Sequence, residues 1–165
     1  MVTPTNNHMV DQLNTLGIHF LQGGTDLPLA CDPIELLQAL AANHEARLRL
    51  ALIPLLLQYP QWASYVPLAI APLSPSAQLV LKCYYTAARL LQAQYHHRLE
   101  KFLGSLTPLP DLFSAELGLS ATDGLTDLAH RQQILTGRYI NWLGTYHHAL
   151  QRWLIHGEVR RTWNS

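Results

Sequence analysis

Histidine is the residue type whose number and spacing first point to chemistry in this sequence. There are nine histidines in 165 residues, and four of them form the doublets His96–His97 and His147–His148. His96 and Glu100 lie four residues apart and Asp127 and His130 lie three apart, so on a helix each pair would place two metal ligands on one face. Carboxylates are few, however, and exposed histidines standing in for Lys and Glu account for the same residues. The sequence therefore predicts no metal and no cofactor.

Arg89 and His96 form a second pattern, with six residues between them. This segment resembles the motif of the helical ribonuclease family called HEPN, in which the Arg stabilises phosphate and the His acts in acid–base catalysis across a dimer interface. Seven residues at about 100° each leave the two side chains within about 20° of one another. Tyr85 and Gln92 on that face predict a polar, accessible strip. Leu90 departs from the family, where a polar residue usually follows the Arg, and an exposed polar edge without catalytic function is the alternative.

Aromatic and basic residues near the C-terminus are further candidates for binding. Four aromatic side chains recur at helical spacing and fit either a ligand pocket or a plain core: Tyr139, Trp142, Tyr146 and Trp153. Beyond the expected last helical turn, Arg160, Arg161 and Trp163 predict a contact with a partner protein. The alternative is that this tail folds back onto its own domain. The sequence has no Gly-rich phosphate loop and no zinc-finger spacing.

Helices must position all of these residues, because no segment alternates with a period of two for long enough to form a strand. The expected fold class is all-α, a single compact domain of five to seven helices. An N-cap residue followed by proline marks helix starts at Asp32 and Ser74. Periodic apolar residues predict a long central helix over about residues 75–104 and a long C-terminal amphipathic helix over about 139–156. Six of them are expected to be buried together: Leu81, Tyr84, Leu91, Trp142, Tyr146 and Leu150.

The N-terminal part of the chain has a weaker pattern. Residues 1–30 are expected to form a loosely ordered arm, with one helical turn around Val10–Leu16, ahead of a helical domain over 31–165. A helix over 45–58 should be kinked at Pro54, and a short one follows to residue 70. These short helices could alternatively form a helix-turn-helix-like DNA-binding unit with Arg47 and Arg49 on phosphates. A pI of about 7.1 counts against a nucleic-acid binder.

Composition favours a protein whose surface is partly covered by another chain. Charged residues make up 13% of the sequence, against about 25% in an average globular protein. The alternative is a monomer that uses Gln, Asn, His and Thr on its surface. Cys31 and Cys83 lack metal-ligand spacing and fit reduced thiols in a reducing compartment. With no export signal and no apolar run long enough to span a bilayer, the expected location is the cytoplasm.

Several stretches resemble a family of uncharacterised helical bacterial proteins associated with neighbouring nucleotidyltransferase genes. They are residues 32–40 with 47–57, 84–92, and 109–119 with 141–146. The resemblance implies a non-enzymatic helical partner of a nucleotidyltransferase, in a toxin–antitoxin-like pair. The expected function is therefore a protein-interaction module, which binds such a partner or forms a homodimer. The HEPN-like ribonuclease and the DNA-binding regulator are the alternatives.

Overall fold

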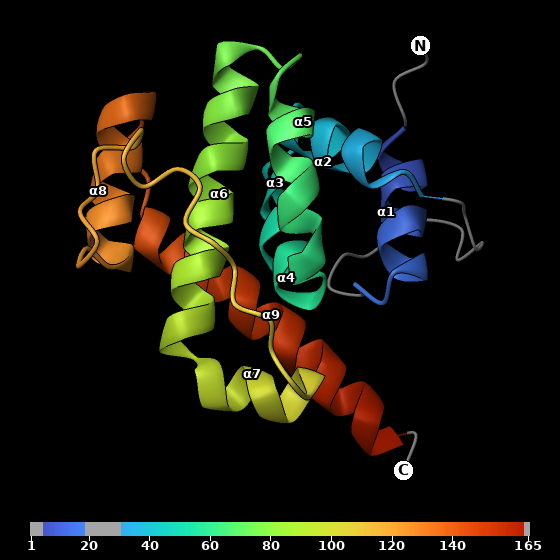
Figure 1. The fold of residues 1–165 in the computed structure, drawn as a ribbon. Coiled ribbons are helices and arrows are strands. Elements are labelled where there is room, and N and C mark those ends of the chain that lie inside the picture. Colours follow the sequence, from blue (N-terminus) through green and yellow to red (C-terminus); the bar gives the residue numbers. More distant parts are fainter. Residues whose placement is uncertain (1–4, 19–30, 164–165) are drawn as a thin grey trace.

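The computed structural model describes the backbone of residues 5–18 and 31–163, and the side chains of these segments up to residue 159. The fold is all-α, as the sequence predicts, and forms one compact domain with no strand among the described residues. Its elements, which Figure 1 shows, are α1 (Asn6–Thr15), α2 (Pro33–Ala41), α3 (Ala46–Leu50), α4 (Leu52–Gln58), a 3-10 helix η1 (Pro60–Tyr65), α5 (Val66–Ile70), α6 (Pro75–Gln94), α7 (His96–Leu103), α8 (Leu125–Thr136) and α9 (Trp142–Trp163). No helix in these described segments is long and apolar enough to cross a membrane.

Helices α2 and α6 begin at the two predicted caps. The Asp32 carboxylate accepts hydrogen bonds from the N–H groups of Ile34 and Glu35, at 2.9 and 3.3 Å. The Ser74 hydroxyl accepts one from the Ala77 N–H at 3.4 Å. In both helices the next residue is proline, which has no N–H to leave unpaired in the first turn.

The helix expected over 45–58 is two helices that meet at Ala51. Pro54 has no N–H to donate to the Leu50 carbonyl, and its ring crowds that carbonyl, so the α-helical ladder breaks one turn earlier. The second piece, α4, is buried along its apolar length, from Leu52 to Leu57. It packs against α6 and α9 and lies at the centre of the core.

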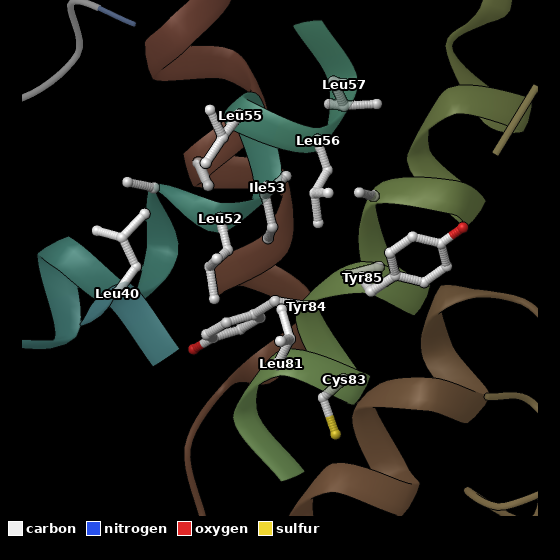
Figure 2. Packing of buried hydrophobic residues seen from close by; sticks show 14 of the residues in the cluster. Leu40, Leu52, Ile53, Leu55, Leu56, Leu57, Leu81, Cys83, Tyr84 and Tyr85 are labelled. Carbon is white, nitrogen blue, oxygen red and sulfur yellow. The ribbon is translucent and has the colours of Figure 1, made fainter. Parts of the chain in front are cut away.

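The core forms where α4, α6 and α9 meet. Figure 2 shows Leu52 and Ile53 of α4 pointing toward Tyr84 of α6. The Tyr84 ring also meets Tyr146 of α9 edge to face, with centroids 6.3 Å apart. All six residues that the sequence predicts to be buried together are buried, which confirms that part of the prediction.

The predicted central helix over 75–104 is interrupted at Tyr95, where φ is −109° and ψ is 30°. Helix α7 therefore turns away from the axis of α6, as Figure 1 shows. The turn brings Phe102 onto Trp153 of α9, with ring centroids 5.0 Å apart, and buries Leu99. The packing of α7 against α9 therefore stabilises the bend more than the continued hydrogen bonding of a straight helix would stabilise the alternative. Breaks at Ala51 and Tyr95, together with α1, bring the helix count above the expected five to seven.

Residues 1–30 do not form only a loose arm, because α1 lies within them. Its Met9, Val10 and Leu13 are buried in the core. The segment that follows is fixed by the Tyr59 hydroxyl, which donates a hydrogen bond to the Leu16 carbonyl at 2.5 Å. A few apolar residues gain enough burial against the domain to order a segment whose own pattern is weak. The rest of the expected arm, residues 1–4 and 19–30, lies outside the described residues.

The C-terminal helix begins and ends later than predicted. Gly137 ends α8 in the left-handed region, with φ of 68°, which favours glycine. The Asn141 side chain then accepts a hydrogen bond from the Gly144 N–H at 2.9 Å and caps the start of α9. Tyr139 therefore lies before the helix and is 90% exposed, whereas the other three residues of the aromatic stripe are buried. The stripe forms core, and Tyr139 is not part of it.

Candidate functional site

Arg89, the predicted phosphate-binding residue, is held against the turn that begins at Asp111. Its guanidinium donates a hydrogen bond to the Ser114 hydroxyl at 3.1 Å and lies 3.9 Å from an Asp111 carboxylate oxygen. Burial acts to raise the pKa of Asp111, but hydrogen bonds from Ser114 and the charge of Arg89 outweigh it and lower that pKa. Asp111 is therefore charged at neutral pH. Arg89 therefore has a charged carboxylate nearby, although its Nε atom is buried without a hydrogen-bond partner among the described residues.

The polar strip expected beside Arg89 is covered. Tyr85 is buried and donates a hydrogen bond to the Pro110 carbonyl at 2.7 Å. Gln92 is also buried, and its amide bonds the Thr107 carbonyl and the Leu109 N–H, both at 2.8 Å. The connection between α7 and α8 thus lies along this face of α6. The expectation of an accessible strip was wrong, because Tyr85 and Gln92 pair with backbone groups of that connection.

His96 lies beyond the bend at Tyr95 and is exposed. His96 Nδ1 lies 3.8 Å from a Glu100 carboxylate oxygen. The alignment calculated for one continuous helix does not apply, since α6 ends at Gln94. Among the described side chains, no hydrogen bond or ion pair joins Arg89 to His96. Within one chain, the ribonuclease pair is not assembled as a site.

In the second His–carboxylate pair, Asp127 and His130 on α8, the carboxylate already caps the helix. The Asp127 carboxylate accepts a hydrogen bond from the Gly124 N–H at 2.9 Å and so caps the helix. His130, on the next turn, is exposed. These two side chains carry no observation that points to a metal.

The region of the proposed DNA-binding unit offers no long exposed helix. Arg47 pairs with Glu45 at 2.6 Å, and Arg49 donates to the Asn43 carbonyl at 2.8 Å. Helix α3, which carries both arginines, has five residues. A recognition helix must present a face to the major groove, whereas α4 is covered by neighbouring helices.

The tail residues Arg160, Arg161 and Trp163 do not lie beyond the last helical turn, because α9 continues through Trp163. Their side chains lie outside the described residues, so their contact with a partner stays a prediction. The preceding turn carries Ile155 and Val159, which are both exposed.

A hollow of about 640 Å³ lies beside Cys31 and is lined by Asp32, Glu35 and Tyr65 among others. Burial, followed by the negative charges of Asp32 and Glu35, raises the pKa of the Cys31 thiol to about 11. The thiolate is the reactive form and the metal-binding form of cysteine. Cys31 is therefore neither an activated nucleophile nor a ready ligand at neutral pH.

An exposed apolar surface lies where α8 ends and α9 begins, and we call it the α8–α9 surface. It consists of Ile134, Leu135, Tyr139 and Ile140, each at least 40% exposed. Leu135 also lines a hollow of about 250 Å³ with Leu79 and Leu117. Sequence reasoning placed Tyr139 in an aromatic stripe that fits a ligand pocket or core, and missed this surface. The sequence does show two pairs of apolar residues on either side of Gly137. Because a glycine at this point ends the helix, the helical pattern that predicts burial does not extend across it.

Comparison with other proteins identifies no relative: no protein-family model matches this chain, and no curated protein or solved structure is significantly similar to it.

Proposed function

We propose that this protein is a non-enzymatic helical interaction module that binds another protein through the α8–α9 surface. The observation that carries the proposal is the exposure of four large apolar side chains within seven residues, at 54% for Ile134, 40% for Leu135, 90% for Tyr139 and 43% for Ile140. Exposed apolar surface of this kind gains about 25 cal/mol for each Å² that a partner covers. Clustered apolar residues mark interaction sites more often than single ones do.

One charge within the surface bears on the chemistry of the partner. Arg138 is exposed between the two apolar pairs. A partner surface that is apolar and carries a carboxylate to pair with Arg138 would complement the apolar side chains and this charge.

The partner we propose is the nucleotidyltransferase encoded beside such proteins in toxin–antitoxin-like pairs. The support for this identity is the resemblance of residues 32–40, 47–57, 84–92, 109–119 and 141–146 to that family. The ribonuclease alternative is not favoured, because Arg89 is held by Ser114 and Asp111. The DNA-binding alternative is not favoured either, because Arg47 and Arg49 bind groups of their own segment.

The test is binding between this protein and the purified nucleotidyltransferase encoded by the adjacent gene. We expect a complex with the wild type and a dissociation constant that is larger by about thirtyfold or more for Tyr139→Ser, because a central aromatic contact contributes about 2 kcal/mol or more. Leu135→Ser should weaken binding as well. Leu68→Ser is the matched control, because Leu68 on α5 is 60% exposed and lies outside the α8–α9 surface.

Equal binding by Tyr139→Ser, Leu135→Ser and the wild type would refute the role of this surface. A neighbouring gene that encodes no nucleotidyltransferase would refute the identity of the partner. Light scattering after gel filtration tests a second copy of this chain as the occupant. A homodimer that Tyr139→Ser dissociates would replace the proposed partner with self-association.

A further inference from the structure

Three potential metal ligands gather at the start of α7, apart from the α8–α9 surface. One ligand atom from each of His96, His97 and Glu100 lies within 4.8 Å of the other two. Among the described residues, these three side chains form a group of histidine and carboxylate ligands that is close enough together to hold one metal ion. All three side chains are exposed, so a cation in solution can reach them.

The backbone explains why these ligands meet. His96 and Glu100 are separated by one helical turn and so share a face of α7. His97 is adjacent, and its ring lies edge to face with the His96 ring at a centroid distance of 6.0 Å. The turn itself is anchored, because Tyr95 packs edge to face on His147 of α9 with centroids 5.8 Å apart. The anchoring reduces the backbone entropy that binding a metal would otherwise cost.

The ligand atoms of His96 and Glu100 do not form a hydrogen bond with each other. His96 Nδ1 and the Glu100 carboxylate oxygen are 3.8 Å apart, which is longer than a hydrogen bond. With bonds of about 2.0–2.2 Å to zinc, two ligands in a tetrahedral site lie roughly 3.3–3.6 Å apart. Small side-chain rotations are therefore enough to close the site. The nearby cation Arg98 is drawn toward Glu158, 3.3 Å away on α9.

We propose that His96, His97 and Glu100 bind a divalent transition metal, with zinc as the best fit and water in the open coordination position. Two imidazoles and one carboxylate suit zinc and its first-row neighbours, whereas magnesium and calcium prefer oxygen ligands alone. The spacing of His96 and Glu100 is visible in the sequence. The bend at Tyr95 and its packing on α9 are not.

The test is calorimetric titration of zinc chloride into the full chain, purified without a histidine tag. We expect one zinc per chain in the wild type. His97→Ala and Glu100→Gln should each weaken the affinity by at least about tenfold, since even residues that only orient a ligand contribute that much. His130→Ala is the matched control and should bind as the wild type does, and magnesium chloride should give no binding heat.

A thermal melt provides a second readout, because a ligand that binds only the folded state raises the melting temperature. At the same zinc concentration, zinc should raise it for the wild type and His130→Ala and raise it less for His97→Ala. Far-UV circular dichroism checks that the variants fold. Two results would overturn the proposal: no saturable zinc binding by the wild type, or variants that bind as tightly as the wild type, which would place the zinc on other histidines.

Discussion

Replacing Gln92 by leucine should loosen the connection between α7 and α8 from α6. The change keeps the side-chain volume close to that of glutamine, so it tests polar contacts rather than packing. It removes two hydrogen bonds of 2.8 Å, to the Thr107 carbonyl and from the Leu109 N–H. Leu109 is buried, whereas Thr107 is exposed and water can replace the lost bond there. The two losses are therefore unequal.

Water cannot replace the hydrogen bond of the buried Leu109 N–H, so leaving this group unpaired should cost about 1–3 kcal/mol. The Thr107 bond should cost about 0.5–1.5 kcal/mol, the net value of an ordinary hydrogen bond. Together they predict a loss of about 1.5–4.5 kcal/mol in the free energy of unfolding, or roughly 3–18 °C in melting temperature for a chain of this size.

Urea denaturation followed by circular dichroism measures this loss, and hydrogen exchange of the Leu109 amide locates it. Gln94→Leu is the control, since Gln94 is exposed on the same helix and its replacement should change stability by less than about 0.5 kcal/mol. A loss below about 1 kcal/mol for Gln92→Leu, with unchanged exchange at Leu109, would refute the reasoning. Another interaction would then have to hold the connection between α7 and α8 over the face of α6 that carries Arg89.

Three further predictions concern the core, the thiols and catalysis. Leu91→Ala should lower the free energy of unfolding by about 2–5 kcal/mol in urea denaturation, because Leu91 is fully buried. A loss under about 0.5 kcal/mol, the value expected for the same change at exposed Leu68, would place Leu91 outside the core. Alkylation of Cys31 should be slow at pH 7 and accelerate up to about pH 11, because its pKa is raised to about 11. The same shift makes stability fall above about pH 9, where the unfolded thiol ionises before the folded one, and a flat pH profile between 9 and 11 would contradict it. The wild type should cleave no RNA, since Arg89 is held by the fold; cleavage that Arg89→Ala and His96→Ala both abolish would reinstate the ribonuclease.

The sequence by itself determined the fold class, two of the helix starts and much of the core. Asp32 and Ser74 with the prolines that follow them act within one turn, so local chemistry is enough to place those caps. The apolar residues of 75–94 repeat at helical spacing, and this pattern correctly identified Leu81, Tyr84 and Leu91 as buried.

Tertiary structure alone decided that a helix breaks at Tyr95 and which polar groups remain accessible. The bend at Tyr95 follows from packing of Phe102 on Trp153, a contact between residues 51 positions apart (153 − 102). The same kind of long-range contact buries Gln92 under Leu109, although a glutamine at that position reads as surface. Tyr139 is the converse, an aromatic residue left exposed because α9 begins at Trp142. Periodicity shows which residues share a face of a helix, but what covers that face depends on segments distant in the sequence.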